Sequence, residues 1–181
     1  AAAARRTLRL INPLSAMEPV YSTPHTLKVL SIGPRTEMEL IHLIGIGFLP
    51  PNITAVDLIS SSPLIDLGDM HQLPYADQSF DVVISSWCLP YSDQPQKAVD
   101  EMVRVSRGGA LAAIGCTFDP SYDPAKAGTR TSATDITGSF FTHADQLVTL
   151  FGDHCAEVCF QHNPIDRKRS GPVMVIVRLH R

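Results

Sequence analysis

The 181-residue chain carries 15 lysines and arginines against 18 aspartates and glutamates, a formal net charge of −3. Hydrophobic residues make up 44% of it and charged residues 18%, which excludes an intrinsically disordered or fibrous protein. The charge gives no strong nucleic-acid signature, and no apolar run approaches the roughly 20 residues of a membrane helix. The length predicts one globular domain.

The first 25 residues differ from the rest of the chain. They open with AAAARRTLRLINPLSAM, which contains three arginines and no acid before Glu18. This composition resembles the end of an organellar transit peptide, and the alternative is an arbitrary starting point of the sequence. On either interpretation, we predict that residues 1–25 form an arm outside the core and that residues 26–181 form the domain.

A regular pattern of apolar runs separated by turn residues begins at residues 27–32, an apolar run that is followed by Gly33 and Pro34. This pattern is typical of a buried strand followed by a tight turn. Residues 36–47 then have apolar side chains at helical spacing. Thr36 and Glu39 fit a capping box, so we expect the helix to begin there.

The clearest strand is predicted at residues 80–86, a run rich in β-branched side chains that indicates burial on both faces. Residues 117–139 are polar and too long for a simple connection, so they predict a lid or insertion. The other predicted elements are strands at 53–57, 63–67, 110–116, 155–161 and 173–179, and helices at 94–107 and 142–153.

This alternation of strands and helices predicts an α/β fold. We expect a single doubly wound, Rossmann-like domain whose sheet has about seven strands, mostly parallel, with the last strand antiparallel. In such sheets, ligands bind beyond the carboxyl ends of the strands.

Three residues lie where predicted strands end. Gly33 follows the first strand and precedes a helix, where backbone N–H groups can face a ligand. Asp57 ends the second strand, 24 residues later, the spacing at which an acid reaches a ribose diol. Asp69 ends the third. These positions converge on one edge of the predicted sheet.

The four cysteines, Cys88, Cys116, Cys155 and Cys159, form no CxxC pair and no regular spacing. The pair at 155 and 159 has no companion ligands in a zinc-binding arrangement, so we predict no metal site. This cysteine usage favours a reducing, intracellular compartment and leaves the cytoplasm and an organelle (mitochondrion or plastid) as alternatives.

Four segments resemble successive motifs of the class I S-adenosylmethionine-dependent methyltransferases, closest to the methyltransferase type 11 group. In chain order they are VLSIGPRTEMEL, ITAVDL, DLGDMHQLPYADQSFDVVISSWCLPYSD and KAVDEMVRVSRGGALAAIG. The first loop differs from the D/E-x-G-x-G-x-G form of that family, because it holds one glycine. Glu37 is then the candidate for the missing acid.

The resemblance implies a site for S-adenosylmethionine. It places Gly33 against the methionine moiety, Asp57 on the ribose hydroxyls and Asp69 on the adenine amino group. Carboxylates are strong acceptors for such donors. Met70 would pack on the adenine ring. The floor near the sulfonium would be lined by Ser85, Ser86 and Trp87.

His71, Tyr91 and Asp93 flank this predicted pocket. They are candidates to remove a proton from a hydroxyl or amine acceptor. The alternative is that His71 and Asp93 are ordinary loop residues and that Tyr91 is a packing residue. In-line methyl transfer depends above all on positioning, so a base is not required.

The function implied by the resemblance is S-adenosylmethionine-dependent methyl transfer to an unidentified acceptor. The alternative, motivated by the altered first loop and the arginine-bearing N-terminal segment, is a catalytically inactive methyltransferase-like subunit of a larger, organellar or other, complex with protein partners. A nicotinamide enzyme is a weaker third hypothesis, because the first loop lacks GxGxxG.

Overall fold

The computed structural model describes residues 2–121 and 140–180, with the side chains of residues 2–6 excepted. Seven strands form one sheet in the order β3-β2-β1-β4-β5-β7-β6. They are β1 (Val29–Ile32), β2 (Ile53–Asp57), β3 (Asp66–Leu67), β4 (Phe80–Ser86), β5 (Ser106–Phe118), β6 (Cys155–His162) and β7 (Gly171–Leu179). Strands β1 to β5 pair in parallel, whereas β7 runs antiparallel to both neighbours. The predicted α/β fold with an antiparallel last strand is confirmed.

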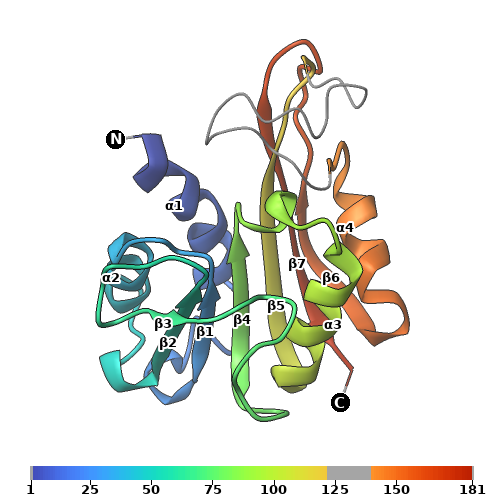
Figure 1. Cartoon of the computed structure of the whole chain (residues 1–181). Helices are drawn as coiled ribbons and strands as arrows, with labels where there is room; N and C mark the ends of the chain where they lie inside the picture. Colours follow the sequence, from blue (N-terminus) through green and yellow to red (C-terminus); the bar gives the residue numbers. More distant parts are fainter. Residues whose placement is uncertain (1, 122–139, 181) are drawn as a thin grey trace.

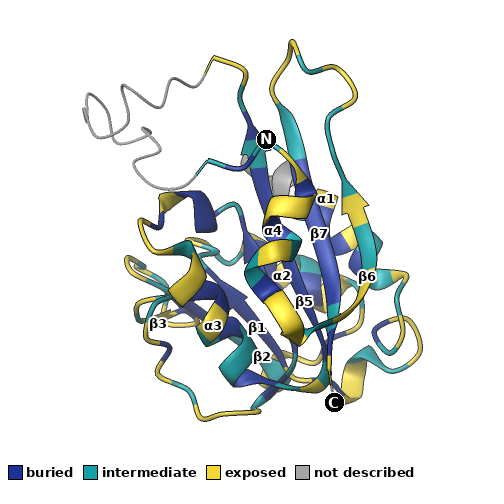
Figure 2. Ribbon diagram, turned by 90° about the vertical axis from the view of Figure 1, so that its right-hand side faces the viewer, coloured by how far each residue is buried: buried dark blue, intermediate teal, exposed yellow. Residues whose placement is uncertain are grey.

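Among the described residues, two helices cover each face of the sheet (Figures 1 and 2). They are α1 (Ala2–Ser15), α2 (Met38–Gly45), α3 (Pro95–Val105) and α4 (Ala144–Phe151). In β4, Val83 points toward α3 and α4, and Val82 and Ile84 point toward α1. This alternation is why the sheet interior is apolar on both faces.

The N-terminal segment is part of the folded unit, and the prediction of an arm outside the core is wrong. Leu10, Ile11 and Leu14 of α1 are fully buried, and Val20 is nearly so. They pack in the same cluster as Val82 and its neighbours on the sheet. Without α1, this apolar face would be open to water, so its burial accounts for the placement.

The other elements follow the predicted order, but β3 has two residues instead of the predicted 63–67, and β5 begins at Ser106 instead of residue 110. Helix starts also differ locally. No capping box forms at Thr36: α2 begins after Glu37, and Glu39 turns inward to accept a hydrogen bond from Ser31. Helix α4 is capped by His143 with Gln146. The predicted lid at 117–139 begins within β5, and its residues 122–139 lie outside the described residues.

Two connections have consequences for the site. The eight residues between β2 and β3 contain no helix, as their short length indicates. The chain crosses from one side of β1 to the other before β4, which creates a switch point between β1 and β4.

None of the described helices combines the length and apolar character that crossing a bilayer requires.

Candidate functional site

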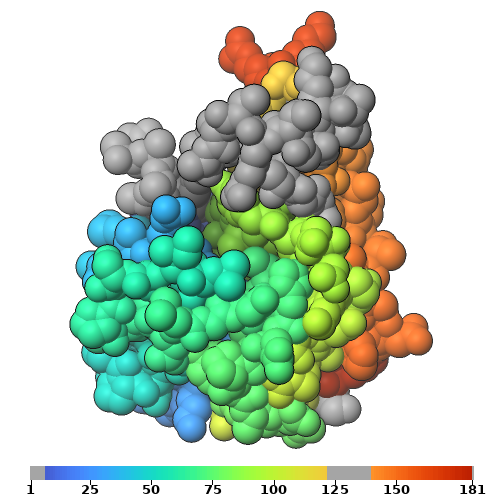
Figure 3. All heavy atoms as spheres, viewed as in Figure 1, coloured from blue at the N-terminus to red at the C-terminus, as the bar shows by residue number. Residues whose placement is uncertain are grey.

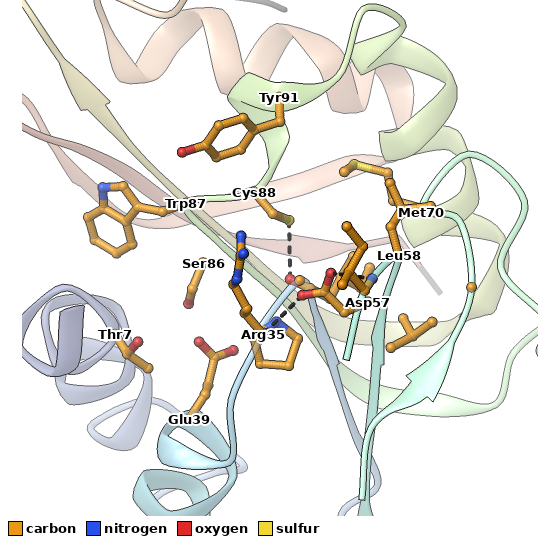
Figure 4. A pocket seen from close by; sticks show the side chains of 16 residues that line it. Thr7, Arg35, Glu39, Asp57, Leu58, Met70, Ser86, Trp87, Cys88 and Tyr91 are labelled. Atoms are coloured by element: carbon orange, nitrogen blue, oxygen red, sulfur yellow. Dashed lines mark hydrogen bonds between the residues drawn. The ribbon is translucent and has the colours of Figure 1, made fainter. Parts of the chain in front are cut away.

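A cavity of about 380 Å³ opens at the carboxyl ends of β1, β2 and β4, at the switch point of the sheet. Clefts at this position are the usual ligand sites of open α/β sheets. Its lining residues come from α1, from the turns after the three strands and from the start of α2 (Figure 4). They are Thr7, Ile32, Gly33, Pro34, Arg35, Glu39, Val56, Asp57, Leu58, Ile59, Gly68, Met70, Ser86, Trp87, Cys88 and Tyr91.

The turn after β1 requires glycine at position 33. Gly33 has φ +73°, and a Cβ there would lie 2.4 Å from the Cβ of Cys88. The Cys88 thiol in turn donates to the Ile32 carbonyl at 3.1 Å. The backbone of the turn at residues 32–33 and the side chain of Cys88 are therefore in close contact beneath the cavity, and no larger residue fits position 33.

Asp57 joins the turn after β1 to the end of β2. Its Oδ2 accepts the Arg35 backbone N–H at 2.9 Å, and its Oδ1 accepts the Ile59 N–H at 3.2 Å. A carboxylate has about four acceptor positions, so these two bonds leave capacity for donors of a ligand. The bonds also fix the carboxylate against the cavity wall.

Glu39 is a buried acid whose carboxyl group faces the cavity (Figure 4). Loss of hydration raises the pKa of Glu39 to about 7, although the nearby hydroxyls of Ser31, Ser86 and Thr7 act against the rise. The Ser31 hydroxyl donates to Glu39 Oε1 at 2.6 Å. The Ser86 Oγ is buried and has no hydrogen bond of good geometry within the described residues.

Trp87 lines the cavity and has a strained backbone conformation. It has φ +60°, an uncommon conformation for a bulky residue that is found most often at functional sites. Its indole N–H donates to Thr117 Oγ1 at 2.8 Å. Its ring lies over Gly115, where a Cβ would come within 2.9 Å of the ring. Strand β5 therefore orients the tryptophan.

His71 and Asp69 bond to each other instead of lining the cavity. Asp69 Oδ1 accepts from the His71 backbone N–H at 2.8 Å and lies 2.6 Å from His71 Nδ1, contacts that lower the pKa of Asp69. His71 Nε2 lies 2.6 Å from Ser92 Oγ, which also accepts the Gln94 N–H at 3.0 Å. Both ring nitrogens of the histidine are therefore engaged.

The predicted site residues divide into two groups. Six of them line the cavity: Gly33, Asp57, Met70, Ser86, Trp87 and Tyr91. Asp69 and Ser85 do not line it, contrary to prediction, and His71 and Asp93, which were predicted to flank it, also lie outside its lining. Asp69 and His71 are held by each other, and the buried Ser85 hydroxyl lies 3.0 Å from the Cys88 thiol beneath the cavity.

Sequence reasoning missed Thr7, Arg35, Glu39 and Cys88 as cavity residues. Glu37, the predicted replacement acid, does not line the cavity; it interacts with Ser62, which lowers the pKa of Glu37. A lone acid among the apolar residues of α2 was the one available signal for Glu39. Within the described ranges, no group of three or more histidine, cysteine or acidic side chains forms a metal-binding cluster.

The family model described as "Methyltransferase domain" matches residues 37–114. Ajmaline N-methyltransferase of Rauvolfia serpentina is 36% identical over 62 residues, which are 34% of this chain and 21% of that protein. Demethylmenaquinone methyltransferase of Renibacterium salmoninarum is 39% identical over 57 residues, 32% of this chain and 24% of that one. The matches thus span about a quarter or less of these relatives.

Solved structures share the fold across nearly the whole chain. A chain from the complex of the Haloferax volcanii Trm112 methyltransferase activator with a methyltransferase matches with a TM-score of 0.69 and 16% identity, covering 99% of this chain and 95% of that one. A methyltransferase from Thermotoga maritima matches with a TM-score of 0.63 and 15% identity, covering 98% and 92%. At these identities, the likeness establishes the fold.

Proposed function

We propose that the chain is a class I S-adenosylmethionine-dependent methyltransferase, which binds S-adenosylmethionine in the cavity at the switch point and transfers the methyl group to an acceptor. One observation carries the proposal: Gly33 and Asp57 come together at the carboxyl ends of β1 and β2 and line one cavity. Fold by itself does not establish activity, so the site has to support it.

The residues present fit this cofactor. Asp57 retains acceptor capacity for the two ribose hydroxyls after its bonds to Arg35 and Ile59. Leu58 and Met70 are apolar walls suited to a flat aromatic base. The buried Ser86 hydroxyl lacks a well-formed hydrogen bond and can make one to a ligand. Asp69 is not included, because its carboxylate turns to His71 and does not line the cavity.

The bound cofactor would supply an electrophilic methyl group, and the protein would position the acceptor for in-line attack. Trp87 and Tyr91 line the cavity, and the Tyr91 side chain is exposed, so these residues form the wall open to an acceptor. Burial raises the pKa of the Cys88 thiol to about 12, so the thiol stays protonated and does not compete as a nucleophile. His71 does not line the cavity, so its ring is not placed to take a proton from an acceptor bound there.

Calorimetric titration with S-adenosylmethionine and S-adenosylhomocysteine tests the proposal. We expect Asp57→Ala to weaken both affinities by about tenfold or more, because hydrogen bonds to a charged acceptor are lost. Asp93→Ala is the matched control, since Asp93 is an exposed acid outside the cavity. A folded chain that binds neither ligand, or an Asp57→Ala variant that binds both normally, would refute the proposal.

A second candidate function is assembly with an activator protein, with the chain as a subunit of a complex. Met38, Ile41 and Ile44 share the outer face of α2 and are exposed, although large apolar side chains on one helix face are normally covered. Figure 3 shows the segment from α2 to β3 as a continuous surface on one side of the molecule. The Haloferax volcanii neighbour comes from a complex with such an activator.

The second candidate is tested by mixing the purified chain with a Trm112-type activator and measuring complex formation by analytical ultracentrifugation. We expect a complex that Ile41→Asp disrupts and that Val158→Asp, on the exposed strand β6, leaves intact. If the unmodified chain forms no complex, this function is excluded. Cofactor binding that persists in Ile41→Asp would separate the two functions.

A further inference from the structure

Arg35 is the one basic residue among the described residues that line the cavity, and the proposed function leaves its side chain without a role. It has a left-handed backbone with φ +56°, and its backbone N–H donates to Asp57 Oδ2 at 2.9 Å. Its guanidinium makes no hydrogen bond or ion pair with any described residue. An arginine fork with free donors in a cavity wall is suited to a carboxylate or a phosphate, whose oxygens match the paired donors.

The direction of this side chain separates it from the cofactor residue beside it. The guanidinium extends toward the side of the cavity lined by Trp87 and Tyr91 and does not turn to the Asp57 carboxylate (Figure 4). Arg35 is also an exposed residue, so it lies at the open side of the cavity. The sulfonium of the cofactor is positive, and a guanidinium in the same cavity repels it unless an anion lies near both.

Two aromatic side chains form the rest of this wall. The indole N–H of Trp87 donates to Thr117 Oγ1 at 2.8 Å, so the ring presents carbon surface to the cavity and no free donor. Its φ of +60° makes it the second residue of the lining, after Arg35, with a strained non-glycine backbone, and such strain is concentrated at functional sites. Tyr91 is 53% exposed and has its ring available to a ligand. Aromatic surface beside a free cation suits a flat ligand with an anionic group.

We propose that Arg35, Trp87 and Tyr91 form the subsite for the methyl acceptor, and that the acceptor is an aromatic molecule bearing a carboxylate or a phosphate group. This inference rests on the proposed function. Arg35 would anchor the anionic group, and the two aromatic side chains would contact the ring. A cationic acceptor would be repelled by both the guanidinium and the sulfonium, and a neutral one would leave the arginine donors unmatched. Arg35 is therefore a binding residue that selects the charge of the acceptor.

The chain has a single tryptophan, so the fluorescence of Trp87 reports directly on this subsite. Benzoate and phenyl phosphate are titrated as anionic probes into the chain saturated with S-adenosylhomocysteine, and benzamide is titrated as a neutral probe with the shape of benzoate. We expect a saturable change in fluorescence with at least one anion, and an affinity for benzamide lower by about tenfold or more. The anion that binds more tightly identifies the group that Arg35 prefers.

Arg35→Gln then tests the arginine itself. We expect it to weaken binding of the anionic probe by about tenfold or more. Its affinity for S-adenosylhomocysteine, measured by calorimetry, should change by less than about threefold, because Asp57 bonds the backbone of residue 35 and not its side chain. Arg9→Gln is the matched control, since Arg9 is an exposed arginine outside the cavity.

The outcomes separate this inference from the proposed function. If the unmodified chain does not bind S-adenosylhomocysteine, the proposed function itself is wrong. If it binds S-adenosylhomocysteine but none of the three probes, or benzamide as tightly as the anions, the acceptor subsite is wrong. An Arg35→Gln variant that loses affinity for S-adenosylhomocysteine as strongly as for the anion would also overturn the inference, because Arg35 would then serve the cofactor. Should that variant not fold, the preference of the unmodified chain for the anions over benzamide still decides.

Discussion

Two separate energetic costs oppose the Gly33→Ala substitution, one from the backbone conformation and one from the close approach of Cys88. Gly33 has φ +73°, which costs an alanine about 1–2 kcal/mol. A Cβ at this position would also lie 2.4 Å from the Cβ and 2.8 Å from the Sγ of Cys88. Overpacking of a rigid core site typically adds about 1–3 kcal/mol. We therefore expect Gly33→Ala to lower the free energy of unfolding by about 2–5 kcal/mol.

Two other glycines serve as controls for the separate costs. Gly152 has φ +50° with no atom within 4 Å of a built Cβ, so Gly152→Ala should show only the conformational cost of about 1–2 kcal/mol. Gly45, at the end of α2, has neither a positive φ nor a neighbour within 4 Å. Gly45→Ala should be neutral or stabilise the chain by up to about 1 kcal/mol.

The assay is urea unfolding followed by circular dichroism, with the slope checked to be unchanged. A second variant tests the identity of the clash. Cys88→Ala keeps the Cβ and should not relieve Gly33→Ala, whereas Cys88→Gly removes the contact and should leave only the conformational cost. If Gly33→Ala costs no more than Gly152→Ala, contact with Cys88 adds no cost at position 33, which would contradict this prediction.

Three further predictions test the core, the buried acid and the thiols. Leu14→Ala should destabilise the chain by about 2–5 kcal/mol in the same assay, with the exposed Arg9→Ala as a near-neutral control; equal effects would contradict the packing of α1. Burial raises the pKa of Glu39 from 4.5 to about 7, so its protonated side chain contributes fully to the free energy of unfolding below pH 4.5. This contribution declines by about 3 kcal/mol as the pH rises to about 7, and Glu39→Gln should abolish the pH dependence. Alkylation at pH 8, read by mass spectrometry, should modify Cys155 before Cys88, and rapid labelling of Cys88 in the folded chain would disprove its burial.

The strands could be predicted from the sequence because their signals are local. Strands β2 and β4 match the ranges predicted from runs of β-branched and apolar residues. A strand buried on both faces needs such a run, whatever it packs against. Helix starts were less well predicted, since capping depends on how one side chain turns: Glu39 faces Ser31 instead of capping α2.

The cavity was predictable only where a residue's place in the chain fixes its place in the fold. Gly33 and Asp57 end neighbouring parallel strands, so their positions follow from the strand order. Asp69 also follows a strand, but its carboxylate turns to His71, two residues away, and leaves the cavity. The conformation of that loop decides the outcome, and no spacing rule encodes it.

The sequence by itself determined the alternation of strands and helices, the family motifs and the two turn residues at the switch point. Only the tertiary structure decided that α1 belongs to the core, because its burial depends on an apolar sheet face assembled from distant strands. It also decided that Arg35 and Glu39 share a cavity with Asp57. A cavity consists of side chains from elements far apart in the chain, and their directions follow from packing, which local sequence patterns do not specify.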